Sequence, residues 1–240
     1  MPRPHPARSL GRPQVFAHRG GAALRPENTL LAFDHGLSLG ADGLEFDVHL
    51  SRDGVVVVHH DRTLERTTNG RGPLAALSAD ELGHLDAGHS FEGFRGAAGG
   101  VPTLEAVLRR YPVPLIIELK VNDPELARKT IDAVRAARTY EPAIRTGSSR
   151  EETRLALYRS WIHWPVQRPP YREFQVPELS GSTRVVSSRF VRYAHKAGIA
   201  VHVWTVNDPA DMRRLLDWGV DGLISDRPDL AVEVVRAQTL

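Results

Sequence analysis

The feature that most constrains the fold is an alternation of short apolar runs with helical patterns along the whole chain. The runs are rich in Val, Ile and Leu and show no clean alternation of polar and apolar residues, which is typical of parallel strands covered on both faces. They are Val15 to His18, Gly43 to Leu50, Val55 to His60, Val113 to Lys120, Val185 to Ser188, Ile199 to Val206 and Asp221 to Ser225. The alternation predicts an α/β fold.

Helices are predicted between these runs, several of them behind residues that commonly cap helices. They are Glu27 to Leu39, Leu104 to Arg110, Pro124 to Arg138, Phe190 to Ala197, Pro209 to Trp218 and Leu230 to Ala237, with Asn28, Thr103, Asp123 and Asp208 as capping candidates. Two more strands, near Ala143 to Thr146 and Ile162 to Val166, bring the count to eight parallel strands and one hairpin strand. We therefore expect a TIM (β/α)8 barrel in a single domain spanning residues 1–240.

One connection departs from a plain barrel. Ser51 to Gly54 is a turn signal too short to cross over to a parallel strand, so the run from Val55 should return as an antiparallel hairpin. A turn centred between Asp53 and Gly54 would place Asp47 opposite His60. The following stretch, residues 61–100, is too long for a simple loop and is predicted to form a small insertion subdomain.

Composition excludes several classes of protein and site. The 240 residues include no cysteine, which excludes disulfides, thiolate metal sites and cysteine nucleophiles. The net charge is +2 and the arginines are spread along the chain, so we expect no nucleic-acid partner. No apolar run is long enough for a membrane span and the first 13 residues do not resemble a secretory signal, so we expect no stable membrane insertion and a cytoplasmic location.

Carboxylates end two of the predicted strands. Glu45 and Asp47 lie two residues apart and share one face of a strand, and Glu118 ends another apolar run, with Lys120 two residues on. Two like charges on one face of a buried strand are costly unless a cation compensates them. Exposure of this face to solvent is the alternative. Three converging carboxylates would make a hard oxygen site for one divalent cation, Mg²⁺ or Ca²⁺.

Two histidines also follow strands. His18, next to Arg19, and His60 could each simply be hydrogen-bonded turn residues. Near a cation bound by carboxylates, however, they would suit acid–base chemistry close to neutral pH. Together with Arg19 and Lys120 they favour cleavage of a phosphodiester, with the positive charges stabilising the phosphoryl oxygens.

Eight short segments occur in a fixed order over about residues 14 to 230: Ala17 to Gly20, Pro26 to Thr29, Glu45 to Val48, His60-Asp61, Val101 to Glu105, Ile117 to Lys120, Val203 to Asn207 and Gly219 to Pro228. In these segments and their order the sequence resembles the glycerophosphodiester phosphodiesterase family. The resemblance implies a TIM barrel with an insertion after the second strand. It implies His18 and His60 as the acid–base pair, and Glu45, Asp47 and Glu118 as metal ligands. It places Arg19 and Lys120 near phosphate and implies release of glycerol 3-phosphate and an alcohol.

Several alternatives stay open. The family's Ser-Phe pair after its fifth strand is absent from Thr146 to Arg150, so the alcohol group of the substrate stays open. The oligomeric state is open as well. The attacking group is either water or the glycerol 2-hydroxyl. Trp204 is predicted to line the substrate pocket, against the alternative of a core tryptophan. A lysophospholipase D using Trp161, Trp164 and Tyr171 is a second enzymatic hypothesis. A catalytically dead phosphate-binding module is disfavoured because both histidines and all three carboxylates are retained.

Overall fold

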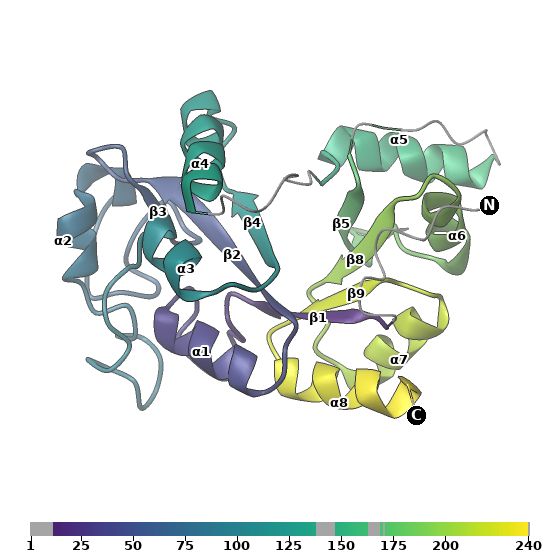
Figure 1. Ribbon diagram of the computed structural model, residues 1–240, viewed down its shortest axis with the longest axis horizontal. Coiled ribbons are helices and arrows are strands. Elements are labelled where there is room, and N and C mark those ends of the chain that lie inside the picture. Colours follow the sequence, from purple (N-terminus) through teal and green to yellow (C-terminus); the bar gives the residue numbers. More distant parts are fainter. Residues whose placement is uncertain (1–11, 138–146, 163–168, 170, 240) are drawn as a thin grey trace. The chain divides into compact units, whose positions relative to one another are not determined.

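A computed structural model describes residues 12–137, 147–162, 169 and 171–239 (Figure 1). These residues fall into two compact units. Unit 2 comprises residues 17–142 and 226–229, and unit 1 comprises residues 1–16, 143–225 and 230–240. Both units combine strands with helices, as the sequence predicts for an α/β fold. No helix within the described ranges is long and apolar enough to cross a membrane.

The strands of unit 2 carry most of the predicted site residues. The central strand, β2 (Gly43–Leu50), pairs in parallel with β4 (Leu115–Leu119) and antiparallel with β3 (Val56–Val58). β2 is buried along almost its whole length, which explains its continuous apolar character. The carboxyl end of β1 (Gln14–His18) lies beside β2, because the amide of Arg19 donates to the carbonyl oxygen of Glu45 at 2.7 Å.

The predicted hairpin is present, but its register differs from the prediction by one residue. Val48 pairs with Val58, and the amide of His59 donates to the carbonyl oxygen of Asp47 at 3.0 Å. Asp47 therefore lies opposite His59, and the predicted pairing with His60 is wrong. The physical reason is a three-residue turn: the amide of Ser51 donates to the carbonyl oxygen of Val55, which leaves Arg52 to Gly54 as the loop. Gly54 has φ +73°, the left-handed conformation that such a turn requires.

Three helices of unit 2 correspond to predicted ones. They are α1 (Leu30–Ser38), α3 (Leu104–Arg110) and α4 (Pro124–Ala137). The short helix α2 (Ala79–Gly83) and a 3₁₀ turn, η1 (Leu74–Ala76), were not predicted. α1 begins three residues later than predicted. Its cap is Thr29, whose hydroxyl accepts from the amide of Ala32, and not Asn28, which has φ +58°. The predicted cap of α3, Thr103, is confirmed.

The segment between β3 and α3 has an apolar cluster of its own. Leu64, Leu74 and Leu82 are essentially fully buried and pack with Val57 and Val101. Short turns and helices around this cluster make up most of residues 61–100. The cluster fixes the backbone of the segment against β3, and it therefore holds the residues that follow His60 in place.

Unit 1 contains a second set of parallel strands. β8 (Ala200–Trp204) pairs in parallel with β5 (Glu173–Pro177) and with β9 (Gly222–Ser225), and the amide of Gln14 in β1 donates to the carbonyl oxygen of Asp221. A small hairpin joins β6 (Leu179–Ser180) to β7 (Thr183–Arg184). The remaining helices are α5 (Arg150–Trp161), α6 (Ser188–Lys196), α7 (Pro209–Asp217) and α8 (Pro228–Thr239), the last beginning in unit 2.

Three predicted strands in this part of the chain either lie wholly or partly outside the described residues or are absent from the structure. The strand expected near Ala143 to Thr146 lies outside the described residues. Ile162, the first residue of another expected strand, caps helix α5, and residues 163–166 lie outside the described residues. Val185 to Ser188 is not a strand. The amides of Val185 and Val186 both donate to the carbonyl oxygen of Glu178, and Ser187 caps α6. Neither β5 nor α5 was predicted.

Candidate active site

Three carboxylates meet where β2 and β4 run side by side. Asp47 and Glu118 are register partners on the two parallel strands, and Glu45 lies two residues before Asp47 on the same face. Each residue offers one oxygen, and these three oxygens lie within 4.8 Å of one another. Glu45 and Asp47 are buried and Glu118 is exposed. The alternative that Glu45 and Asp47 lie on a solvent-exposed face is therefore wrong.

The electrostatics of this cluster fit a hard cation. Burial, with the neighbouring charge of Asp47, raises the pKa of Glu45 to about 7, so its ionised form lacks sufficient compensation from the protein alone. Burial also opposes ionisation of Asp47, but the charge of Arg19 and the contacts of Asn28 and Lys120 outweigh it and lower the pKa of Asp47. The three carboxylates offer only oxygen donors, and the negative charge of Glu45 is poorly compensated. Such a set suits Mg²⁺ or Ca²⁺.

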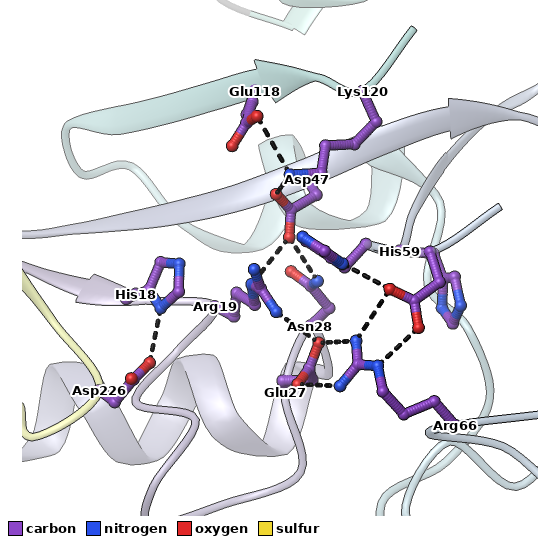
Figure 2. Close-up of polar contacts among 12 residues, drawn as sticks. His18, Arg19, Glu27, Asn28, Asp47, His59, Arg66, Glu118, Lys120 and Asp226 are labelled. Carbon is purple, nitrogen blue, oxygen red and sulfur yellow. Dashed lines mark hydrogen bonds and ion pairs between the residues drawn. The ribbon is translucent and has the colours of Figure 1, made fainter. Parts of the chain in front are cut away.

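His18 ends β1 and is held by a carboxylate from far along the chain. Its Nδ1 lies 2.5 Å from Oδ1 of Asp226 (Figure 2). Its Nε2 lies 3.8 Å from Oε2 of Glu45. Burial alone would lower the pKa of His18, but the hydrogen bond to Asp226 and the charge of Glu45 raise it. Asp226 thus orients the ring so that Nε2 faces the acidic cluster.

His60 follows β3 and is held in the same way. Its Nδ1 lies 2.5 Å from Oδ1 of Asp61, and its carbonyl oxygen lies 3.0 Å from Nε2 of His49. The ring of the preceding His59 is buried, with Nε2 3.1 Å from the carbonyl oxygen of Thr63. Burial lowers the pKa of both His49 and His59, so these two rings are neutral supports of the backbone around His60.

The two predicted phosphate-binding cations are held by the same carboxylates. The guanidinium of Arg19 lies 3.1 Å from Oδ2 of Asp47 and donates to Oε1 of Glu27 at 3.0 Å. Nζ of Lys120 lies 3.1 Å from Oδ1 of Asp47 and 3.0 Å from Oε1 of Glu118 (Figure 2). The structure therefore brings both cations to the predicted metal ligands.

Other side chains of this network were not assigned roles by the sequence. They are Glu27, Asn28, Asp61, Arg66 and Asp226. Asn28 donates to Oδ2 of Asp47 at 2.9 Å from a left-handed backbone conformation, which asparagine tolerates better than most residues. The sequence offered one signal for them: four of the five lie in the short segments that carry the family resemblance. Arg66 lies outside these segments.

The aromatic residues singled out in the sequence differ in their exposure to solvent. Trp204 ends β8 in unit 1 and is 42% exposed, so it is not a core tryptophan wedged between sheet and helices. Its contact with substrate stays a prediction. Trp161 is exposed on α5, whereas Tyr171 is buried against Phe174 and cannot supply an exposed patch. Trp164 lies outside the described residues.

Sequence and structure comparisons give the relatives of this chain. The profile of the glycerophosphoryl diester phosphodiesterase family matches residues 18–168 and 125–230. A glycerophosphodiester phosphodiesterase of Caldanaerobacter subterraneus subsp. tengcongensis is 32% identical over 92% of this chain and 97% of its own length. One from Bacillus altitudinis is 33% identical over 92% of this chain and 97% of its own.

Solved structures agree with the sequence relatives. A phosphodiesterase of Oleispira antarctica, determined in complex with the product sn-glycerol-3-phosphate, is 26% identical, with a TM-score of 0.74 over 94% of this chain and 98% of that one. A second solved structure, from Silicibacter pomeroyi, is 24% identical, with a TM-score of 0.74 over 95% of each chain. Both structures have the TIM-barrel fold, so the predicted fold class is confirmed. The chain belongs to the glycerophosphoryl diester phosphodiesterase family and, like its relatives, is an enzyme.

Proposed function

We propose that this enzyme hydrolyses glycerophosphodiesters to glycerol 3-phosphate and an alcohol, with one bound divalent cation and with His18 and His60 as the acid–base pair. One observation carries the proposal. Each of the two imidazoles is held at Nδ1 by a carboxylate 2.5 Å away, in the same unit as the three-carboxylate cluster. The product complex of the Oleispira antarctica relative and the names of the sequence relatives support the substrate class.

Glu45, Asp47 and Glu118 are the residues that would hold Mg²⁺ or Ca²⁺. The bound ion would supply positive charge to the phosphoryl oxygens as negative charge builds up on them. Arg19 and Lys120, both already beside Asp47, would add to that charge and orient the phosphate.

The two histidines divide the proton transfers. A carboxylate at Nδ1 holds the proton there and leaves Nε2 available to the reacting groups. One imidazole removes the proton of the attacking oxygen, and the other protonates the alkoxide that leaves when the P–O bond breaks. Trp204, exposed at the end of β8, is proposed to pack against the glycerol carbons, and the kinetics of Trp204→Ala test this role.

A phosphorus NMR time course with glycerophosphocholine tests the activity, with Mg²⁺ or Ca²⁺ and with EDTA. We expect a glycerol 3-phosphate signal with metal and none with EDTA. An early cyclic phosphate signal would identify the glycerol 2-hydroxyl as the attacking group, and its absence would favour water. Activity unchanged by EDTA would contradict the metal requirement.

The histidines are tested by single substitutions. His18→Ala and His60→Ala should each lower kcat by at least about 100-fold, because a general acid or base contributes about 10²–10⁴-fold. His84→Ala, an exposed histidine on the insertion, is the control and should keep its kcat. Near-normal turnover in both site variants would mean that the two histidines are structural.

A lipid phosphodiester is a second candidate substrate, and one observation favours it. Leu155, Tyr158, Trp161 and Ile162 are all exposed on one side of α5 and its cap. Aromatic and aliphatic side chains of this kind suit the interface of a lipid aggregate. The same NMR assay with lysophosphatidylcholine, run on wild type and Trp161→Ala, distinguishes the two substrates, because only lipid turnover should fall in the variant.

A further inference from the structure

The side chain of Arg66 lies between two carboxylates at the edge of the site (Figure 2). Its Nε donates to Oδ2 of Asp61 at 2.5 Å, and its Nη1 donates to Oε2 of Glu27 at 2.8 Å. Its Nη2 donates to both residues, to Oε1 of Glu27 at 2.7 Å and to Oδ1 of Asp61 at 3.2 Å. These contacts use four of the five N–H groups of the guanidinium. Arg66 therefore directs most of its hydrogen-bonding capacity to protein carboxylates.

Each of these carboxylates holds a second site residue. Oδ1 of Asp61 lies 2.5 Å from Nδ1 of His60. Oε1 of Glu27 accepts from Nη1 of Arg19 at 3.0 Å. A continuous chain of contacts thus runs from His60 through Asp61, Arg66 and Glu27 to Arg19.

The backbone that carries Arg66 is itself well anchored. Leu64, two residues before it, is fully buried in the apolar cluster of the insertion, and the hydroxyl of Thr68 donates to the carbonyl oxygen of Leu64 at 2.8 Å. The side chain of Arg66 is 46% exposed, so isolated ion pairs at this position would contribute little to stability. The forked contacts of Arg66 with two carboxylates add geometric specificity, since each partner is held in one orientation.

We propose that Arg66 is a positioning residue, which fixes the imidazole of His60 through Asp61 and the guanidinium of Arg19 through Glu27. The inference rests on the proposed function, in which His60 transfers a proton and Arg19 binds phosphate. It assigns the insertion a part in the reaction without contact with substrate. Only a planar, forked cation can bridge two carboxylates in this way, so lysine is not an equivalent residue here.

The charge state of the partners is consistent with this role. Burial opposes ionisation of Asp61, but the hydrogen bonds from Arg66 and His60 keep its pKa well below the usual range. An ionised carboxylate is an acceptor only, so it holds a proton on Nδ1 of His60 and leaves Nε2 for the reaction.

The first test uses kinetics to separate the effect of Arg66 on His60 from its effect on Arg19. Arg66→Gln should lower kcat by about 10–100-fold, because His60 loses its fixed orientation; this is the usual effect of losing a residue that orients a functional side chain. The same substitution should raise KM, because Arg19 loses its fixed orientation. In a His60→Ala background, the same substitution should no longer lower kcat but should still raise KM. The control is Arg110→Gln, which removes a half-exposed arginine that is bidentate to Asp34 and should leave both constants unchanged.

The second test is spectroscopic and independent of turnover. Long-range ¹H–¹⁵N correlation spectra should show neutral His60 of the wild type as the Nδ1–H tautomer and His60 of Arg66→Gln as a mixture of both. Should Arg66→Gln fail to fold, Arg66→Lys is measured in the same way, and we expect an intermediate loss because lysine keeps the charge but not the fork.

The outcomes that overturn the proposal are distinct from those that overturn the proposed function. Wild-type kcat in His60→Ala would contradict the proposed function whatever Arg66 does. An inactive His60→Ala together with unchanged kcat and tautomer in the Arg66 variant would contradict only the positioning role. An equal loss of kcat with and without His60 would also contradict it, since Arg66 would then act by another route.

Discussion

At the scale of single residues, the site depends on carboxylates that touch no substrate in the proposed reaction. Asp226 is the clearest example, because its oxygen lies 2.5 Å from Nδ1 of His18 and no other residue is recorded on that nitrogen within the described part of the chain. Without a charged acceptor, His18 can adopt the tautomer that places its proton on Nε2. The ring would then be unable to accept a proton there.

We therefore expect Asp226→Asn to lower kcat by more than about 10-fold while leaving the fold intact, since loss of the corresponding carboxylate in a Ser-His-Asp triad costs about 10⁴-fold. Steady-state kinetics with a thermal melt check this. Asp229→Asn is the matched control, because Asp229 accepts from Arg227, to which the proposed reaction gives no role. A kcat in Asp226→Asn equal to that of the control would show that His18 needs no orientation.

At the scale of elements, the turn from β1 to α1 places His18 and Arg19 by close packing. Gly20 has φ +88°, and a Cβ on it would lie 2.7 Å from the backbone of Ala32 and 2.9 Å from the ring of Phe33. Gly36, one turn further along the same helix, is equally close, since its own Cβ would lie 2.7 Å from the carbonyl oxygen of Gly20. Only glycine permits the turn to lie this close to α1.

Gly20→Ala should therefore lower both the melting temperature and kcat, because the turn that carries His18 and Arg19 must move away from α1. Gly72→Ala is the control that separates backbone strain from steric contact. Gly72 also has a positive φ, +81°, but nothing lies within 4 Å of the position of an added Cβ. We expect the control to lose some stability and keep its kcat. Equal melting temperatures and equal kcat in the two variants would contradict the packing argument.

The link between α1 and α3 predicts a dependence of stability on pH. Asp34 of α1 accepts from Arg110 at 2.7 Å and from the hydroxyl of Tyr111 at 2.9 Å, and the hydrogen bond from Arg110 lowers the pKa of Asp34 despite some burial. Since the pKa is lower in the folded state, the link stabilises the fold fully above the unfolded pKa of about 3.9. This contribution is lost as the pH falls through the folded pKa.

Thermal melts of wild type and Asp34→Asn between pH 7 and pH 2 measure this contribution. The variant should melt at a lower temperature at pH 7, and the difference should shrink below about pH 4. Asp132→Asn, which removes one partner of an exposed pair with Arg128 on a single helix, should show little difference at any pH. A difference for Asp34→Asn that is constant over the whole range would contradict the assignment.

At the level of the whole molecule, the proposed metal site would couple ion binding to the stability of the fold. Folding brings Glu45 and Asp47 out of water and next to Glu118, and a cation that binds only this arrangement stabilises the folded state by mass action. The melting temperature should therefore rise with Mg²⁺ or Ca²⁺ concentration. At 100 times the Kd of the ion, the stabilisation is about 2.7 kcal/mol.

Glu45→Gln should remove this rise, because it deletes the ligand whose charge the protein compensates least. Glu105→Gln, an exposed carboxylate of α3 paired with Arg109, should retain it and is the control. Calorimetric melts with and without EDTA give both results. A rise of equal size in the two variants would place the ion elsewhere.

Local patterns alone predicted the α/β class, most of the strands and helices of unit 2, and the shared face of Glu45 and Asp47. These features depend on neighbours in sequence: the two-residue period of a strand fixes which side chains share a face, and caps such as Thr103 act within one turn. The structure confirms that these carboxylates approach Glu118, since the parallel pairing of β2 with β4 places Asp47 beside Glu118.

The tertiary structure decided what local patterns leave open. The register of the hairpin depends on a three-residue loop, which is centred on Asp53 and not between Asp53 and Gly54. This places His59, and not His60, opposite Asp47. The partner of His18 lies 208 residues away, and Glu27, one of the two partners of Arg66, lies 39 residues away, so no period in the sequence relates these pairs. Such contacts form only when strand pairing and the apolar cluster around Leu64 have fixed the backbone, because a hydrogen bond needs its donor and acceptor within about 3 Å.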